Sequence, residues 1–332
     1  MDLRTRYLGL TLTSPLVPSA SPLSEKIENL RRMEDAGAGA VVLHSLFEEQ
    51  IEQESQTLLH YLDAGTESNA ESLSWLPMPS EQRFGVDEYL EHVRRAKQAL
   101  GIPVIASLNG ATPGWWVKTA GRVQQAGADA IELNLYHVAA DPETTSADVE
   151  ERLLEIVREF RSATTLPMAV KIGPYFSALA SFARELTLAG TDGLVLFNRF
   201  FQPDIDLEAL ETRSNVQLST PNEMRVRLRW IAILRGRIQA SLAATGGVHD
   251  WEDAAKLLLA GADVVMLCSA LLRLGIPYLG EVKDGLSRWL SERDYESVEQ
   301  MKGSMSQLAC QNPTAFERAS YIKAITGYHL AV

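Results

Sequence analysis

A short phrase that occurs four times constrains the fold of this chain more than any other feature. In each copy an Ala-Gly pair is followed, two residues later, by an apolar run; the copies are residues 36–43, 126–133, 189–196 and 260–267. We expect an amphipathic helix to end before each copy and the glycine to take the left-handed position that closes it. Runs that are apolar on both faces are typical of buried parallel strands.

A second set of apolar runs lies between these copies, at residues 15–20, 103–107, 167–171 and 238–245. Interleaving the two sets predicts eight strands. Helices are predicted in most gaps, at roughly 24–36, 86–100, 114–126, 146–163, 176–189, 222–235 and 250–260. Eight alternating units are typical of a closed parallel (β/α)₈ TIM barrel of the α/β class. A doubly wound open sheet is the alternative.

The length fits one barrel domain with insertions, because such a domain has about 250 residues. We therefore predict a single domain over residues 1–332. Two long polar segments, residues 44–85 and 199–221, follow the second and sixth strands, so they are expected at the catalytic face. Residues 276–332 are predicted to form a helical tail outside the barrel.

Composition excludes several partners. The net charge of −12 argues against nucleic acid, which requires a basic face. A membrane segment is not expected, because no apolar stretch approaches about 20 residues and the N-terminus does not resemble a signal peptide. The two cysteines, Cys268 and Cys310, have no metal-binding spacing and are interpreted as small core residues. A reduced, cytoplasmic location without a metal site is the expectation.

The ends of the predicted strands locate the candidate site, because barrel chemistry comes from the C-terminal ends of strands. Those ends carry Ala20, Ser21, His44, Ser45, Ser107, Asn109, Asn134, Tyr136, His137, Lys171, Asn198, Arg199, Gly246, Gly247, Cys268 and Ser269. The Gly246-Gly247 pair and the residues after the eighth strand match the phosphate site that many barrels build there. A simple tight turn is the alternative interpretation.

Lys171 and His137 are the candidate catalytic residues. A lysine in a buried strand suits a Schiff base or an anionic cofactor or substrate; a structural salt bridge is the alternative. His137 is a candidate acid–base group near neutral pH. Asn134 and Asn198 suit the edge of a planar heterocycle, although capping is the usual role of Asn. Surface or packing roles are expected for His60, His92, His249 and His329.

Most of the chain resembles the dihydroorotate dehydrogenase family of FMN-dependent barrels, class 1 in particular. The resemblance rests on ordered segments: Ser14-Pro15-Leu16 through Ser21, Ser107-Leu108-Asn109-Gly110, Ile131-Glu132-Leu133-Asn134-Leu135, residues 170–176, Thr245-Gly246-Gly247-Val248, Ala260-Gly261-Ala262 and Cys268-Ser269-Ala270-Leu271. It implies that Ala20, Ser21, Ser107, Asn134 and Lys171 line the flavin. It also implies that Gly246, Gly247, Cys268 and Ser269 hold its phosphate, and that Asn198 faces the substrate or the flavin. By analogy with this class, a homodimer is expected.

The chain departs from the family on the substrate side. The family's Asn-Leu-Ser-Cys-Pro-Asn signature reads here as residues 134–139, so His137 replaces the cysteine base and Ala139 replaces an orotate-binding amide. The amide-bearing loop of the family corresponds to residues 72–78, from Ser72 to Met78, and the lysine expected after the second strand is missing at Leu43 or His44. Lost donors disfavour orotate.

The resemblance and these departures together imply an FMN-dependent oxidoreductase that acts on a CH–CH group of a small molecule, related to pyrimidine biosynthesis but with a substrate other than dihydroorotate. Asn198, Ser72 and Tyr136 are assigned to the substrate side, and His137 is the expected base, with Tyr136 or His44 next in order. A Schiff-base aldolase using Lys171 is one alternative. A barrel that binds FMN without turnover is the other.

Overall fold

The computed structural model describes residues 1–49, 85–110, 113–199, 203–213, 217–311 and 313–317. Within these ranges one sheet contains eight parallel strands in the order β3-β12-β11-β8-β7-β6-β5-β4. The strands are β3 (Leu16–Pro18), β4 (Val41–Phe47), β5 (Val104–Asn109), β6 (Ala130–Asn134), β7 (Met168–Ile172), β8 (Gly193–Leu196), β11 (Ser241–Thr245) and β12 (Val264–Leu267). The predicted (β/α)₈ barrel is confirmed, and the open sheet is excluded.

The two outer strands of this order, β3 and β4, meet at a glycine. Gly39, just before β4, donates its backbone N–H to the carbonyl of Leu16 at 2.9 Å. A side chain at position 39 would collide with the carbonyl oxygen of Ser14. The other three copies of the repeated phrase carry Asp at this position, so the glycine of the first copy marks the place where the sheet closes on itself.

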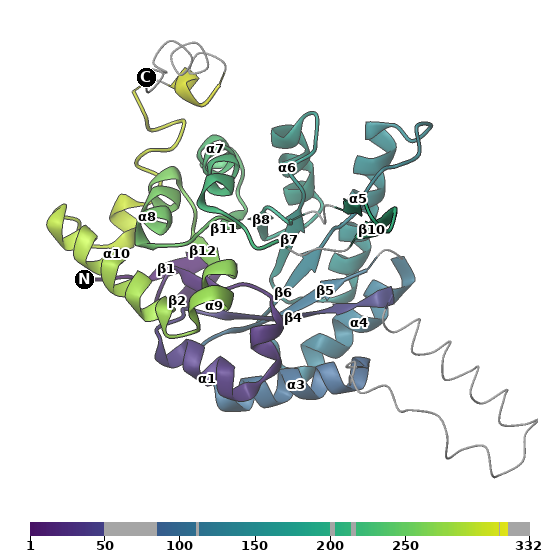
Figure 1. Cartoon of the computed structure of the whole chain (residues 1–332), viewed down its shortest axis with the longest axis horizontal. Coiled ribbons are helices and arrows are strands. Elements are labelled where there is room, and N and C mark those ends of the chain that lie inside the picture. The colour runs from purple at the N-terminus through teal and green to yellow at the C-terminus, as the bar shows by residue number, and fades with distance from the viewer. Residues whose placement is uncertain (50–84, 111–112, 200–202, 214–216, 312, 318–332) are drawn as a thin grey trace, which may run out of the picture.

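Helices surround the sheet on its outer face (Figure 1). They are α1 (Ile27–Asp35), α3 (Val86–Ala99), α4 (Pro113–Ala126), α5 (Ser146–Ala163), α6 (Leu179–Leu188), α7 (Met224–Leu234), α8 (Trp251–Ala260) and α10 (Tyr278–Glu292). The first seven lie within about three residues of their predicted bounds. The helix α10 had been assigned to a C-terminal tail. It lies outside the barrel as predicted, but it packs on α8, with Gly285 against the Trp251 ring, and serves as the helix after β12.

The remaining short elements are η1 (Pro22–Glu25), η3 (Pro221–Glu223), α9 (Ser269–Leu274), α11 (Val298–Met301) and η4 (Pro313–Phe316), with two antiparallel hairpins, β1 (Thr5–Tyr7) with β2 (Leu10–Leu12) and β9 (Asp204–Asp206) with β10 (Glu211–Arg213). Two of them were expected from the sequence, the short helix headed by Cys268-Ser269 (α9) and helical structure in the tail beyond residue 276 (α11), whereas the others were not. The second hairpin lies in the long segment after β8. Most of the long segment after β4 lies outside the described residues. Among the described residues, no helix has the length and apolar character needed to cross a membrane.

The N-terminal hairpin closes one end of the barrel. Tyr7, Leu8 and Leu12 are buried and pack in one cluster with the inward-facing strand residues Val17, Val42, Ile105, Ala130, Ala169, Val195, Ala243, Val264 and Met266. Several of these residues are alanines, which leaves room for the hairpin side chains. The opposite end, where the strands finish, remains available for a site.

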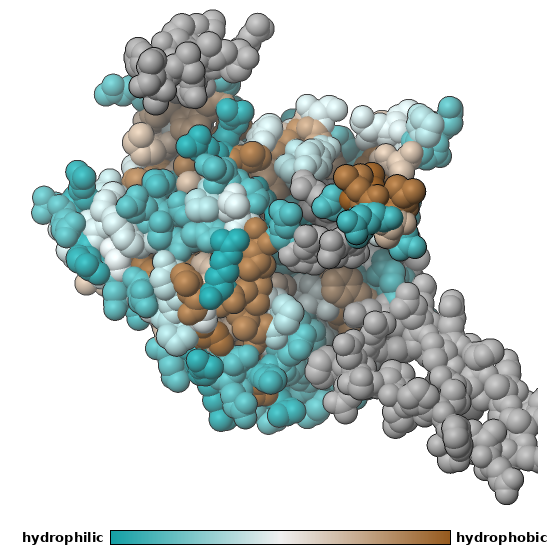
Figure 2. All heavy atoms as spheres, viewed as in Figure 1, coloured by the Kyte–Doolittle hydropathy of each residue, from teal (hydrophilic) through white to brown (hydrophobic). Residues whose placement is uncertain are grey.

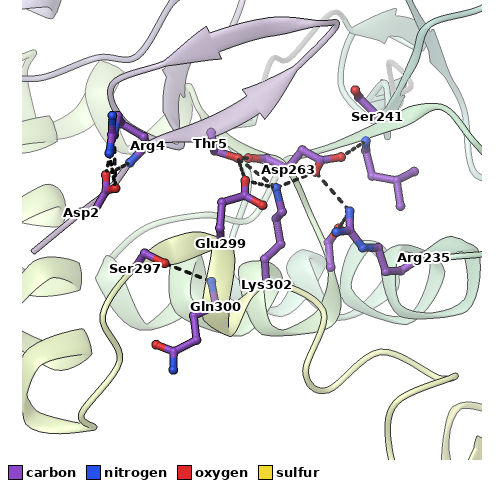
Figure 3. A network of polar contacts seen from close by, with 12 residues as sticks. Asp2, Arg4, Thr5, Arg235, Ser241, Asp263, Ser297, Glu299, Gln300 and Lys302 are labelled. Atoms are coloured by element: carbon purple, nitrogen blue, oxygen red, sulfur yellow. Dashed lines mark hydrogen bonds and ion pairs between the residues drawn. The ribbon is translucent and has the colours of Figure 1, made fainter.

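The acidic position of the repeated phrase ties neighbouring units together at the closed end. In three copies its carboxylate accepts a backbone hydrogen bond from the start of the preceding strand and pairs with a basic residue at the end of the helix before that strand: Asp129 with Val104 and Lys97, Asp192 with Met168 and Arg161, and Asp263 with Leu242 and Arg235. Figure 3 shows the most extensive case, in which Lys302 lies 2.9 Å from Asp263 and Thr5 donates to the Asp263 carbonyl. The N- and C-terminal segments are thereby fastened to the barrel.

Candidate functional site

A pocket of about 190 Å³ lies at the C-terminal ends of β3, β7, β8, β11 and β12. We call it the mouth pocket. It brings together seven residues that were assigned above to the cofactor or the substrate: Ala20, Lys171, Asn198, Gly246, Gly247, Cys268 and Ser269. Phe197, Arg199, Ser219 and Thr245 are among its other walls. The pocket therefore joins the predicted phosphate end of the site to the predicted flavin floor.

The turn after β11 requires glycine at both positions. Gly246 and Gly247 have φ values of +91° and +83°, a conformation that other residues adopt only with strain. A side chain on Gly247 would collide with the backbone of Met224, and one on Gly246 would meet the guanidinium of Arg227. The turn is therefore tight, which was the alternative interpretation of the glycine pair. It also exposes backbone atoms to the pocket, with no side chain in front of them.

Two serine hydroxyls lie beside this turn. Ser219 donates to the hydroxyl of Ser269 at 2.9 Å and accepts from the N–H of Gly247 at 3.2 Å. His249, for which a surface or packing role was expected, places Nε2 3.5 Å from the Ser219 hydroxyl. The sequence had indicated Ser269 but not Ser219, because Ser219 lies in a polar segment without periodicity. Backbone N–H and hydroxyl groups of this kind are typical ligands of phosphate oxygens.

A buried ion pair forms the floor of the mouth pocket. Lys171 Nζ lies 3.2 Å from Glu132 Oε1, with side-chain exposures of 10% and 0%. The second carboxylate oxygen of Glu132 is buried and has no hydrogen-bond partner among the described residues. The alternative interpretation of Lys171, a structural salt bridge, is therefore confirmed. Lys171 also lines the pocket, so it is available to a ligand as well.

The repeated phrase itself marks Glu132 as an unusual residue, although Glu132 was not among the predicted site residues. In the four copies of the repeated phrase, the position of Glu132 is otherwise taken by Val42, Val195 and Met266, which all face the barrel interior. A carboxylate at that position is buried on the barrel axis. Its strand neighbour β7 then supplies the lysine, because β6 and β7 pair in parallel register with Asn134 opposite Lys171.

Ser107 and Asn134 extend this polar floor across the neighbouring strands. Asn134 Nδ2 donates to the Ser107 hydroxyl at 3.0 Å and to the Leu108 carbonyl at 3.3 Å. The hydroxyls of Ser45 and Ser107 lie 2.8 Å apart. Ser107, Asn134 and Lys171 thus end three adjacent strands, as predicted, and their side chains are buried. Ser21 is also buried, directly after Ala20, whereas Ser72 lies outside the described residues.

The histidine His44 faces away from the mouth pocket, so its interpretation as an alternative base is wrong. The register of β4 against β5 shifts between Val42 and Ser45, which turns Ser45 toward Ser107. The His44 ring instead lies 5.2 Å from Tyr89 and 5.3 Å from His92, both on α3. Burial, with a smaller contribution from His92, lowers the pKa of His44 to about 4. The ring is a neutral packing group.

The candidate base His137 lines a second, larger cavity, which we call the side cavity. It encloses about 430 Å³ between the loop after β6 and the loop after β7, and its walls include His137, Ala139, Thr145, Tyr175 and Phe176. No lining residue of the side cavity belongs to the mouth pocket. His137 and Tyr136 are half-buried, three and two residues beyond Asn134. His137 therefore lines the side cavity and not the mouth pocket, although its loop begins directly after Asn134.

Comparison with known proteins assigns this architecture to a family. The sequence model described as dihydroorotate dehydrogenase matches residues 2–290. The chain belongs to the dihydroorotate dehydrogenase family. Its similarity to the catalytic subunit of dihydroorotate dehydrogenase B (NAD(+)) from Pyrococcus abyssi is 29% identity, over 91% of this chain and 98% of that protein. The corresponding subunit from Thermoplasma acidophilum is 27% identical, over 91% of this chain and 98% of that protein.

A relative with a different printed activity is also similar. The NAD-dependent dihydropyrimidine dehydrogenase subunit PreA of Escherichia coli is 25% identical, over 91% of this chain and 76% of that protein. The chain is thus similar to relatives whose names give different substrates.

Proposed function

We propose that this member of the dihydroorotate dehydrogenase family is an FMN-dependent oxidoreductase that acts on a CH–CH donor other than dihydroorotate. One observation carries the proposal: a bare glycine turn with adjacent hydroxyls and a floor of Lys171, Asn134 and Ser107 surround the same barrel mouth. The first part suits a phosphate. The second suits the polar edge of a flavin ring, which needs both donors and a positive charge.

The residues present fit FMN at both ends. Gly246 and Gly247 leave no side chain between the turn and a ligand, and Ser219 and Ser269 offer hydroxyls beside it. A phosphate group would be held there by backbone N–H and O–H donors. Lys171 would hold the polar edge of the ring at the other end, because its amine is the buried cation of the pocket wall.

FMN, when bound, would supply the acceptor for a hydride from the substrate. Within this chain, Glu132 orients Lys171 through their ion pair, and Ser107 holds the amide of Asn134 through a hydrogen bond. We assign proton removal to the loop after β6, with His137 as the base and Tyr136 on the substrate side. A neutral imidazole is a suitable proton acceptor near neutral pH.

A direct test of the base is the variant His137→Ala. General bases contribute about 10²- to 10⁴-fold, so flavin reduction by the substrate should slow by at least about 10²-fold while FMN affinity is unchanged. Val138→Ala, at an exposed position of the same loop, is the matched control. Reduction at the wild-type rate in His137→Ala would assign the base elsewhere.

Substrate choice follows from the missing amides. Ala139 lies on the exposed rim of the side cavity and offers no donor, and the segment that includes Ser72 and Met78 lies outside the described residues. Stopped-flow mixing with dihydroorotate should bleach the flavin slowly or not at all, because a site without these amides leaves the polar groups of orotate unpaired. Rapid, complete bleaching would refute the proposed change of substrate.

The aldolase alternative is disfavoured by Glu132. A Schiff-base lysine attacks a carbonyl through a free amine, whereas Lys171 Nζ is held in an ion pair with Glu132 at 3.2 Å. The visible absorbance of the purified protein tests the proposal: a yellow flavin spectrum is expected, and a colourless protein trapped by borohydride with an aldehyde would overturn it. Flavin that no candidate donor reduces would indicate a binding protein without turnover.

We also propose a cytoplasmic homodimer. Both cysteines are free, in keeping with a reducing compartment. Exposed apolar side chains gather on the β9–β10 hairpin (Figure 2), where Ile205, Leu207 and Leu210 are 64–83% exposed, and contiguous apolar surface supports a protein contact. Light scattering of Leu207→Asp tests this: a monomeric variant is expected, and an unchanged mass would exclude the hairpin from the interface.

A further inference from the structure

Arg227, on α7, is a buried cation directly behind the Gly246–Gly247 turn. Only 7% of the residue is exposed. Its Nε donates to the carbonyl of Thr245 at 3.0 Å, and its Nη1 donates to the carbonyl of Glu223 at 2.8 Å. A Cβ placed on Gly246 would lie 2.9 Å from Nη2, so the guanidinium touches the back of the turn whose front lines the mouth pocket.

The charge of Arg227 has no carboxylate in ion-pair contact among the described residues. Glu223, the residue just before α7, instead pairs with Arg199 at 3.4 Å and accepts from the N–H of Thr220. Burial accordingly lowers the pKa of Arg227, although Glu223 acts in the opposite sense. A buried charge that is compensated only by carbonyl dipoles destabilises a fold, so its presence calls for a counter-charge.

We propose that Arg227 provides the positive charge that binds a phosphate monoester dianion on the pocket side of the Gly246–Gly247 turn, and so makes the site prefer FMN to riboflavin. The identity of the ligand rests on the function proposed above. The role of Arg227 is that of a positioning residue. It holds the turn through Thr245 and supplies its charge through the turn, where no side chain intervenes.

The stability of the protein without ligand distinguishes a role of the Arg227 charge in binding from a purely structural role. Arg227→Met removes the buried charge, Arg227→Gln keeps donors without the charge, and Arg227→Lys keeps the charge. Arg225→Met is the matched control, because Arg225 lies on the same helix but is exposed. The measurements are thermal unfolding without ligand and the affinities for FMN, riboflavin and inorganic phosphate.

The expected results differ between the two roles. Arg227→Met should unfold at the wild-type temperature or above it, since an uncompensated buried charge has been removed. The same variant should lose about tenfold in FMN affinity, because the charge behind the turn no longer attracts the phosphate, and nothing in riboflavin affinity. Arg227→Lys should retain more FMN affinity than Arg227→Gln, and Arg225→Met should behave as the wild type.

A lower unfolding temperature for Arg227→Met, together with equal losses for FMN and riboflavin, would overturn the inference in favour of a structural role. Wild-type affinity for FMN in Arg227→Met and Arg227→Gln would overturn it while leaving the proposed cofactor intact. If FMN does not bind to the wild type but inorganic phosphate stabilises it through Arg227, the cofactor proposal fails and the charge role stands. Binding of neither FMN nor phosphate would overturn both.

Discussion

Breaking the Glu132–Lys171 ion pair from the carboxylate side should destabilise the barrel more than removing both charges. In Glu132→Gln the amide keeps the size of the side chain but leaves Lys171 with a charge in a site where 10% of its side chain is exposed. In the double variant Glu132→Gln with Lys171→Met, no charge remains. Buried pairs generally behave in this way, because the penalty lies in the unpaired partner.

The structure sets the size of the effect. At 3.2 Å, the attraction between unit charges is about 5 kcal/mol for an effective dielectric constant near 20. Lys171 borders the mouth pocket, which allows some access to water, so we expect Glu132→Gln to lower the free energy of unfolding by about 3 kcal/mol, at the lower end for broken buried pairs. The double variant should recover at least about half of this loss.

A complete double-mutant cycle tests this prediction by urea unfolding; it compares the wild type, Glu132→Gln, Lys171→Met and the double variant. A coupling free energy of about 2 kcal/mol or more is expected. The reasoning would be refuted if the coupling were below about 0.5 kcal/mol, or if the double variant were less stable than Glu132→Gln. Either result would mean that the carboxylate does not compensate the lysine in the folded protein.

Three other outcomes are expected. In Gly247→Ala the new side chain would have a strained φ of +83° and would collide with the Met224 backbone, so titration should show FMN affinity reduced by about tenfold or more. Unchanged affinity would contradict the binding of the phosphate at the Gly246–Gly247 turn. Asp263→Ala removes one of the two carboxylate partners of Lys302, which also pairs with Glu299, and the acceptor of the buried Leu242 N–H, so it should lower the unfolding free energy by about 2 kcal/mol without altering FMN affinity; an altered affinity would contradict its place at the closed end. The pKa of His44 falls from 6.5 to about 4 on folding, so the unfolded chain binds more protons between these pH values. The free energy of unfolding should therefore decrease as the pH drops through this range, by up to about 3 kcal/mol. His44→Leu should flatten this pH dependence in urea titrations, and an unchanged slope would assign the dependence to other groups.

Local signals were enough to determine the architecture. The repeated phrase encodes the end of a helix, a left-handed glycine and the start of a buried strand within eight residues, so each unit is specified by neighbours in the chain. This is why the helix bounds from the sequence agree with the structure within about three residues. The strand ends also followed, and with them the grouping of Ser107, Asn134 and Lys171 on adjacent strands.

Contacts between distant segments were decided only by the tertiary structure. A one-residue irregularity in β4 turned His44 toward α3 and Ser45 toward the interior, and no local pattern in the sequence signals such a shift. Ser219 and Arg227 come from a segment and a helix whose own periodicity says nothing about the glycine turn. The glutamate that faces Lys171 is 39 residues away in the chain and meets it only through the parallel register of β6 and β7. Secondary structure depends on residues within a few positions of one another, whereas the chemistry of a barrel mouth depends on side chains that the closed sheet brings together from all its strands.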